Sequence, residues 1–129
     1  MHERPDHTSG LQACAAVGQC ELMFLYDKLF SEYGVVVSQL LFTGYTLNHP
    51  EEKAHLVDTF NQLLEYDALP IVNENDSVSV EELLHGDNDC LSATVAQLIG
   101  ADLLILLTDT DGLFDANPAE NEDAHLIGR

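Results

Sequence analysis

Basic side chains are scarce in this chain of 129 residues, which has 4 Lys and Arg against 23 Asp and Glu and a formal net charge of -19. A surface with so few cations repels the phosphates of nucleic acids and of anionic lipids. We therefore expect neither nucleic acid nor a membrane as a partner. Most of the acid is interpreted as a solvated surface, and metal sites are the alternative interpretation of the same excess.

Long apolar runs and an even set of cysteines are also missing. No stretch approaches the ~20 apolar residues that span a bilayer, although hydrophobic residues make up 46% of the chain and suffice for a core. Cys14, Cys20 and Cys90 are an odd number without zinc-ligand spacing, which favours reduced thiols in a cytoplasmic protein. Residues 1–10 are polar and lack the apolar stretch of a signal peptide, so they are predicted to be a disordered leader.

Apolar residues at helical spacing alternate along the chain with short apolar runs. The helical period and its stop signals predict helices over residues 12–33, 51–66 and 88–99. The short apolar runs predict strands over residues 35–42, 69–72 and 103–107. Residues 77–85 alternate weakly and are predicted to form a hairpin or an irregular crossover.

Apolar strands that alternate with helices are typical of a mainly parallel sheet covered on both faces. The sequence therefore predicts an α/β fold, a three-layer αβα sandwich with a mainly parallel sheet. Ligands of such sheets bind at the carboxyl ends of the strands. Two predicted strands run into polar residues there: 69–72 into residues 73–76, and 103–107 into Thr108 and Asp109. We expect the site at these two strand ends.

Three polar clusters carry the candidate chemistry, and each also has a structural interpretation. NEND at residues 73–76 combines amides and carboxylates, as an amino acid ligand requires, but Asn and Asp also form turns. GDND at residues 86–89 precedes a helix that Asp87 or Asn88 would cap. TDTDGLF at residues 108–114 contains Asp-Gly, a strong turn signal. Neither a calcium-loop pattern nor zinc-ligand histidine spacing is present in the sequence, so no metal site is predicted from these residues.

The order and spacing of the clusters are far more specific than any one of them. The chain carries PIVNEND, GDNDCLSA and GADLLILLTD in that order, with AAVGQ and LLFT upstream. In these segments it resembles the glutamate 5-kinases of the amino acid kinase family, over roughly residues 11–127. Other amino acid kinases share the fold but not the paired NEND and GDND signatures. The resemblance implies that residues 11–129 are a partial amino acid kinase domain, with an incomplete amino acid kinase-like sandwich.

The resemblance also implies an activity. Glutamate 5-kinases phosphorylate the γ-carboxylate of L-glutamate with Mg-ATP and give glutamyl 5-phosphate, the first step of proline biosynthesis. By motif, Asp76 and Asn88 are expected to bind glutamate, with Asn73 lining the same pocket. Asp89 is the expected catalytic residue, which would position the family's lysines.

Thr108 and Asp109 are expected, by the same resemblance, to touch the nucleotide, so ATP and Mg²⁺ are the implied cofactors. Phosphoryl transfer depends on cations that stabilise the transferred group. The 4 basic residues of the chain all lie outside the clusters: Arg4, Lys28, Lys53 and Arg129. The family's lysine-bearing segments do not match any part of this sequence, so we expect a central fragment without catalysis of its own.

Two other functions stay open at this point, a non-catalytic remnant that binds a partner or an amino acid, and a small acidic cation-binding protein. The family further implies a homo-oligomer and proline as a candidate feedback inhibitor. Like charges gathered in one cleft disfavour ionisation. We therefore expect at least one acid of the clusters to titrate above the ~3.9 of a free Asp.

Overall fold

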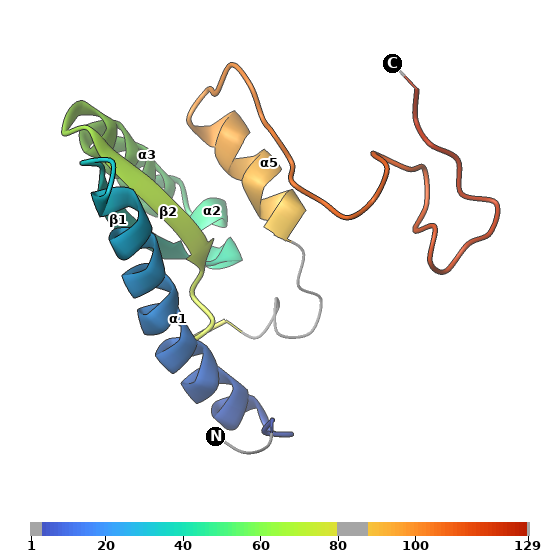
Figure 1. The fold of residues 1–129 in the computed structure, drawn as a ribbon, viewed down its shortest axis with the longest axis horizontal. Helices are drawn as coiled ribbons and strands as arrows, with labels where there is room; N and C mark the ends of the chain where they lie inside the picture. The colour runs from blue at the N-terminus through green and yellow to red at the C-terminus, as the bar shows by residue number, and fades with distance from the viewer. Residues whose placement is uncertain (1–3, 80–87, 129) are drawn as a thin grey trace.

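The computed structural model describes residues 4–79 and 88–128, and most of its regular structure forms one α/β unit (Figure 1). The elements are α1 (Thr8–Ser31), β1 (Val36–Phe42), α2 (Gly44–Asn48), α3 (Pro50–Glu65), β2 (Ala68–Glu74) and α5 (Asn88–Leu98). The three predicted helices and the first two predicted strands are confirmed to within a few residues. Helix α1 begins at Thr8, inside the stretch predicted as a leader. The predicted hairpin or crossover lies mostly outside the described residues.

The ends of the helices follow from local sequence. Pro50 opens α3, where its missing N–H is not needed. Helix α5 ends at a Schellman motif around Gly100, whose φ of 65° is a conformation that glycine adopts without strain. There the Ala101 N–H donates to the Ala96 carbonyl at 2.8 Å, and the Gly100 N–H donates to the Gln97 carbonyl at 3.3 Å. The chain is thereby turned back sharply after α5.

Strands β1 and β2 are parallel and pair in register from Val36 opposite Ala68 to Phe42 opposite Glu74. Parallel neighbours require a crossover connection, which α2 and α3 provide here. Helix α2 was not predicted, because five residues that begin with glycine carry no readable helical period. The parallel pairing places the carboxyl ends of both strands at one edge of the sheet.

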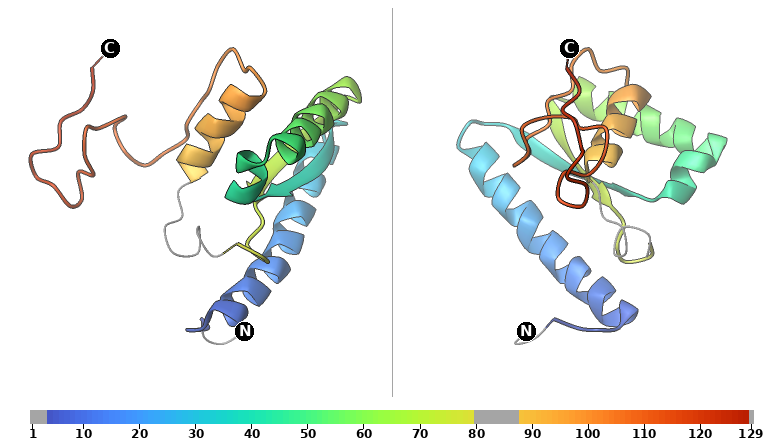
Figure 2. Two further views of the ribbon diagram at one scale, coloured as in Figure 1. Left: turned by 180° about the vertical axis from the view of Figure 1, so that it is seen from behind. Right: turned by 90° about the vertical axis from the view of Figure 1, so that its right-hand side faces the viewer.

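Helices cover both faces of this sheet, as Figure 2 shows, so the three-layer α/β prediction is confirmed in an incomplete form. Phe42 of β1 is buried with Leu56 and Phe60 of α3, and side chains of β2 and α5 pack against this cluster. Successive strand residues point to opposite faces. Val72 therefore faces α3 and α5, whereas Asn73 faces α1, where its side chain meets Gln19.

The predicted strand over residues 103–107 is wrong. These residues are not in a strand, and every side chain of the run is exposed, up to 94% at Leu107. A strand is stable only when its backbone groups pair with a neighbour. In the described ranges, no backbone hydrogen bond joins this run to another segment. An apolar run predicts that side chains will be buried, but it does not say which strand the backbone will pair with. In the described residues, no neighbouring strand pairs with this run.

Two further findings concern the chain as a whole. Within residues 4–79 and 88–128, no helix is both long and apolar enough to cross a membrane. Among the described residues, Cys14, Cys20 and Cys90 are not joined by a disulfide bond. Beyond the apolar run, the last described residues form turns and an isolated antiparallel bridge between Phe114 and Leu126.

Candidate functional site

The NEND cluster is both a strand end and a turn. Asn73 and Glu74 are the last residues of β2, and the Asn75 N–H continues the ladder by donating to the Phe42 carbonyl at 3.0 Å. The Asn75 carbonyl then accepts hydrogen bonds from the N–H groups of Val78 and Ser79, at 3.0 and 2.9 Å. The polar end of β2 therefore leads directly into a turn, so both interpretations of the NEND cluster apply. The turn holds Asp76 at the carboxyl end of β2.

Asn73 is held from helix α1. Its side-chain Nδ2 donates to Oε1 of Gln19 at 3.1 Å, across 54 positions of sequence. Among the described residues, the Gln19 Nε2 group is buried and has no hydrogen-bond partner. A buried donor without an acceptor costs about 1–3 kcal/mol. A ligand that supplied an acceptor oxygen at this point would recover that free energy.

Sequence reasoning missed Gln19 as a site residue. The residue belongs to the AAVGQ segment that carries part of the resemblance, which was the one available signal. Nothing in the spacing of the sequence, however, indicates that α1 reaches the end of β2. Only the packing of α1 on the sheet brings Gln19 to Asn73.

The surroundings of Asp76 change the pKa of its carboxyl group. Burial, and to a smaller extent the charge of Glu74, raise the pKa of Asp76 above its ordinary value of 3.8. The prediction that at least one acid of the clusters has a raised pKa is thus confirmed, although burial is the larger cause and not charge repulsion. Glu74 itself accepts a hydrogen bond from the Ser79 hydroxyl. Glu74 belongs to the predicted NEND cluster but was given no role in it, and Ser79 is a neighbour of the cluster that the sequence did not single out.

The GDND cluster leads into α5, and its described residues are Asn88 and Asp89, whereas Gly86 and Asp87 lie outside the described ranges. Asp89 stands in the first turn of α5, where a negative charge is favoured by the helix dipole. Its backbone carbonyl accepts a hydrogen bond from the Ser92 hydroxyl at 2.8 Å. Figure 1 shows the beginning of α5 at the same end of the sheet as the carboxyl end of β2.

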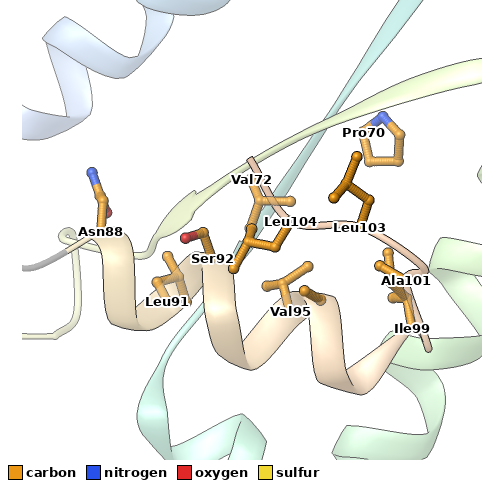
Figure 3. A pocket seen from close by; sticks show the side chains of 11 residues that line it. Pro70, Val72, Asn88, Leu91, Ser92, Val95, Ile99, Ala101, Leu103 and Leu104 are labelled. Carbon is orange, nitrogen blue, oxygen red and sulfur yellow. The ribbon is translucent and has the colours of Figure 1, made fainter. Parts of the chain in front are cut away.

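Asn88 lines a cleft of about 430 Å³ between β2, α5 and the segment that follows α5. In Figure 3, Pro70 and Val72 of β2 border the space on one side and Leu91 and Val95 of α5 on the other. Asn88 therefore lies on the α5 side of β2, whereas Asn73 lies on the α1 side. Asn88 and Asn73, which the sequence predicts to line one glutamate pocket, therefore lie on different faces of the sheet.

Thr108 and Asp109 are not brought to this edge. Both are exposed, in a turn where the Thr110 N–H donates to the Thr108 hydroxyl at 3.3 Å. Figure 1 shows the segment that follows α5 running away from the sheet. The two strand ends that the sequence predicts to meet therefore do not meet, because the second strand does not form.

The cleft itself is poorly suited to a charged ligand, since Asn88 and Ser92 are the polar residues among those that line it. The described part of the chain also holds no group of three or more His, Cys, Asp or Glu side chains that could bind a metal ion. In nucleotide sites, Mg²⁺ is usually held by one or two carboxylates together with the phosphates. The polar edge of β2 is thus the candidate site.

Comparisons with known proteins agree with the motifs. A sequence profile described as the Amino acid kinase family matches residues 2–129. The chain is 54% identical over 127 residues to a glutamate 5-kinase of Clostridium acetobutylicum, covering 98% of this chain and 48% of that protein. It is 51% identical to a glutamate 5-kinase of Carboxydothermus hydrogenoformans, covering 34% of that protein. A glutamate 5-kinase of Streptococcus thermophilus is 50% identical and covered to 49%. The chain spans half or less of these relatives.

Proposed function

Because the chain belongs to the amino acid kinase family, we propose that it is a central part of a glutamate 5-kinase, with residues 11–129 contributing part of the kinase domain. The complete kinase would transfer the γ-phosphoryl group of ATP to the γ-carboxylate of L-glutamate. The chain spans 48% of one relative and 34% of another, so the activity is proposed for the complete protein and not for these 129 residues alone.

The observation that carries the proposal is the polar edge of β2. An amino acid ligand presents an ammonium group and carboxylates at once. When ionised, the half-buried Asp76 carboxylate would accept hydrogen bonds from the ammonium group, and the unpaired Gln19 Nε2 would donate to a carboxylate oxygen. Asn88 would reach the same ligand from the α5 side, if the ligand lies across the edge of the sheet. Asn73 would hold Gln19 in place.

The phosphoryl side of the reaction needs groups that this chain does not provide. Asp89 would position lysines from the rest of the kinase, since opposite charges at close range attract strongly where solvent is excluded. Thr108 and Asp109 would contact the nucleotide once their segment is held against the sheet. ATP would enter as its magnesium complex.

The same proposal implies where the complete kinase acts, how it assembles and what inhibits it. It would act in the cytoplasm in proline biosynthesis, as a homo-oligomer that proline inhibits. Neither a non-catalytic remnant nor a cation-binding protein gains support, because the relatives named above are all glutamate 5-kinases.

A chimera tests the proposal. The matching 127 residues of the Clostridium acetobutylicum relative would be replaced by this chain, and ATP consumption would be measured with and without L-glutamate. We expect glutamate-dependent turnover, and a loss of about 100-fold or more on Asp76→Ala, the scale on which misplaced reactants lose rate. The control is Asp58→Ala, which removes an exposed acid on α3. A folded chimera without glutamate-dependent turnover, or equal effects of the two substitutions, would contradict the proposal.

A further inference from the structure

A side-chain hydrogen bond closes the turn that follows β2. The Ser79 hydroxyl donates to Oε1 of Glu74, five positions earlier in the chain, and the contact is half-buried. In the backbone of the same turn, the Asn75 carbonyl accepts from the N–H groups of both Val78 and Ser79. A hydrogen bond to a carboxylate is roughly twice as strong as one between neutral groups. Glu74 and Ser79 therefore add a strong contact between the two ends of the loop that contains Asp76.

Glu74 also acts on Asp76 through its charge. Burial is the larger cause of the raised pKa of Asp76, and the charge of Glu74 is the second cause. The two carboxylates therefore lie close enough to repel each other. A Glu74 side chain that moved freely would change the direction and the strength of this repulsion. The hydrogen bond from Ser79 restrains the Glu74 carboxylate and so keeps the surroundings of Asp76 constant.

We propose that Glu74 and Ser79 are positioning residues of the substrate site, and that their hydrogen bond holds the Asp76 carboxylate where it receives the ammonium group of the amino acid. The inference rests on the proposed function, which assigns this ammonium group to Asp76. Neither positioning residue needs to contact the ligand. Because the pair acts on the binding of the ammonium group, its loss should weaken the binding of glutamate. The binding of ATP and the transfer step should change little.

A purely structural role for the pair is the alternative. Serine often forms hydrogen bonds within turns without any part in ligand binding. In that case, loss of the bond would impair all kinetic constants together or none of them. The same turn contains a matched control, because Ser77 is exposed and the hydrogen bond between Ser79 and Glu74 does not involve it. Comparison of the two serines therefore separates positioning of Asp76 from a general effect on the turn.

Substitutions of the two serines in the chimera with the Clostridium acetobutylicum relative test the inference. Ser79→Ala should raise the KM for L-glutamate about tenfold, the scale of one hydrogen bond to a charged group. It should change kcat and the KM for ATP by less than about twofold, because the pair contributes to the binding of glutamate alone. Ser77→Ala should leave all three constants within about twofold of the parent. Ser79→Thr keeps the hydroxyl and should restore most of the affinity for glutamate.

A double-mutant cycle tests whether the two positioning residues act through one bond. Glu74→Ala should raise the KM for L-glutamate about tenfold, as Ser79→Ala does. The double variant should also show an increase of about tenfold and not of about 100-fold, because both substitutions remove the same hydrogen bond. Far-ultraviolet circular dichroism would establish that each variant is folded. Additive effects in folded variants would overturn the inference.

The remaining outcomes distinguish failure of this inference from failure of the proposed function. In an active chimera, an unchanged KM for glutamate in Ser79→Ala would overturn the inference alone. Equal increases of this KM in Ser79→Ala and Ser77→Ala would do the same, as would parallel changes of kcat and of both KM values. A folded parent chimera without glutamate-dependent turnover would overturn the proposed function, and the inference with it.

Discussion

Residues 8–79 and 88–98 form an α/β unit, whereas the segment from residue 101 to residue 128 contains no helix and no paired strand. Both regions contain apolar side chains, but they differ in how far those side chains are buried. Phe60 of α3 is 2% exposed, whereas Leu107 is 94% exposed although it ends one of the most apolar runs in the chain. The α/β unit contains both strands of a pair and the helices that cover them. The run at 103–107 has no neighbouring strand in the described residues. An apolar run becomes a strand only where the rest of the fold provides a partner for its backbone.

The first prediction concerns the free energy of unfolding, for which we expect the largest difference between the two regions. Phe60→Ala would remove a buried ring from a core with few buried residues, at a cost of about 3–5 kcal/mol. Leu107→Ala removes an exposed side chain and should change stability by less than about 0.5 kcal/mol. Urea unfolding followed by circular dichroism would measure both. A Phe60→Ala variant as stable as Leu107→Ala would show that the α/β unit has no working core.

The second prediction compares a glycine just after a helix, Gly100, with a glycine inside one, Gly18. Gly100 has a φ of +65° and Gly18 lies inside α1, and a side chain at either position would meet no atom within 4 Å. Gly100→Ala should destabilise the chain by about 1 kcal/mol or more, because only its backbone conformation is strained. Gly18→Ala should stabilise it by about 0.5–1 kcal/mol. Opposite signs in one thermal unfolding series are expected, and equal signs would refute the Schellman ending of α5.

The third and smallest effect concerns pH. Because burial raises the pKa of Asp76 in the folded chain above 3.8, the folded state binds this proton more tightly than the unfolded state. The contribution of Asp76 to stability is therefore complete below pH 3.8 and is lost as the pH rises through the folded pKa. Asp76→Asn should raise the melting temperature at pH 7 relative to the parent, with the difference disappearing near pH 3.

The matched control for this effect is Asp58→Asn, which removes the same charge from the exposed face of α3. Its melting temperature, relative to the parent, should show much less dependence on pH. Differential scanning calorimetry between pH 3 and pH 7 would resolve the two variants. Parallel curves for both variants would mean that net charge, and not the burial of Asp76, governs the effect.

Much of the fold could be predicted from the sequence, because helical periods and stop signals are local. Pro50 and Gly100 mark helix ends by their own backbone preferences, and the structure uses both. The strand at 103–107 could not be judged in this way, because pairing depends on a neighbour that no local pattern names. Helix α2 was too short to show a period. The error at 103–107 thus concerns a long-range contact, whereas the missed α2 and the early start of α1 are local errors.

The residues of the candidate site also fall into two groups: those that the local sequence could select, and those that only the packing of distant segments brings together. Asn73, Asp76 and Asn88 could be selected because polar residues follow a buried strand or precede a helix. In the structure, Asn73 lies in the last part of β2, Asp76 lies in the turn after it, and Asn88 is the first residue of α5. Gln19 could not be assigned, since its contact with Asn73 spans 54 positions. The sequence predicts a raised pKa for at least one acid of the clusters but not which one. Burial, the main cause of the raised pKa of Asp76, depends on packing that the sequence does not display.

Glutamate-dependent ATP consumption by the purified chain, beside the chimera at equal concentration, tests the central claim most directly. The proposal under test is that this chain supplies part of the glutamate site of a glutamate 5-kinase but not the cations on which phosphoryl transfer depends. Its 4 basic residues lie outside the clusters, and losing a single group that stabilises the transition-state charge typically costs ~100-fold or more in rate. The account predicts turnover in the chimera and none above a protein-free control in the chain alone. Turnover in the chain alone that Asp76→Ala abolishes would contradict it.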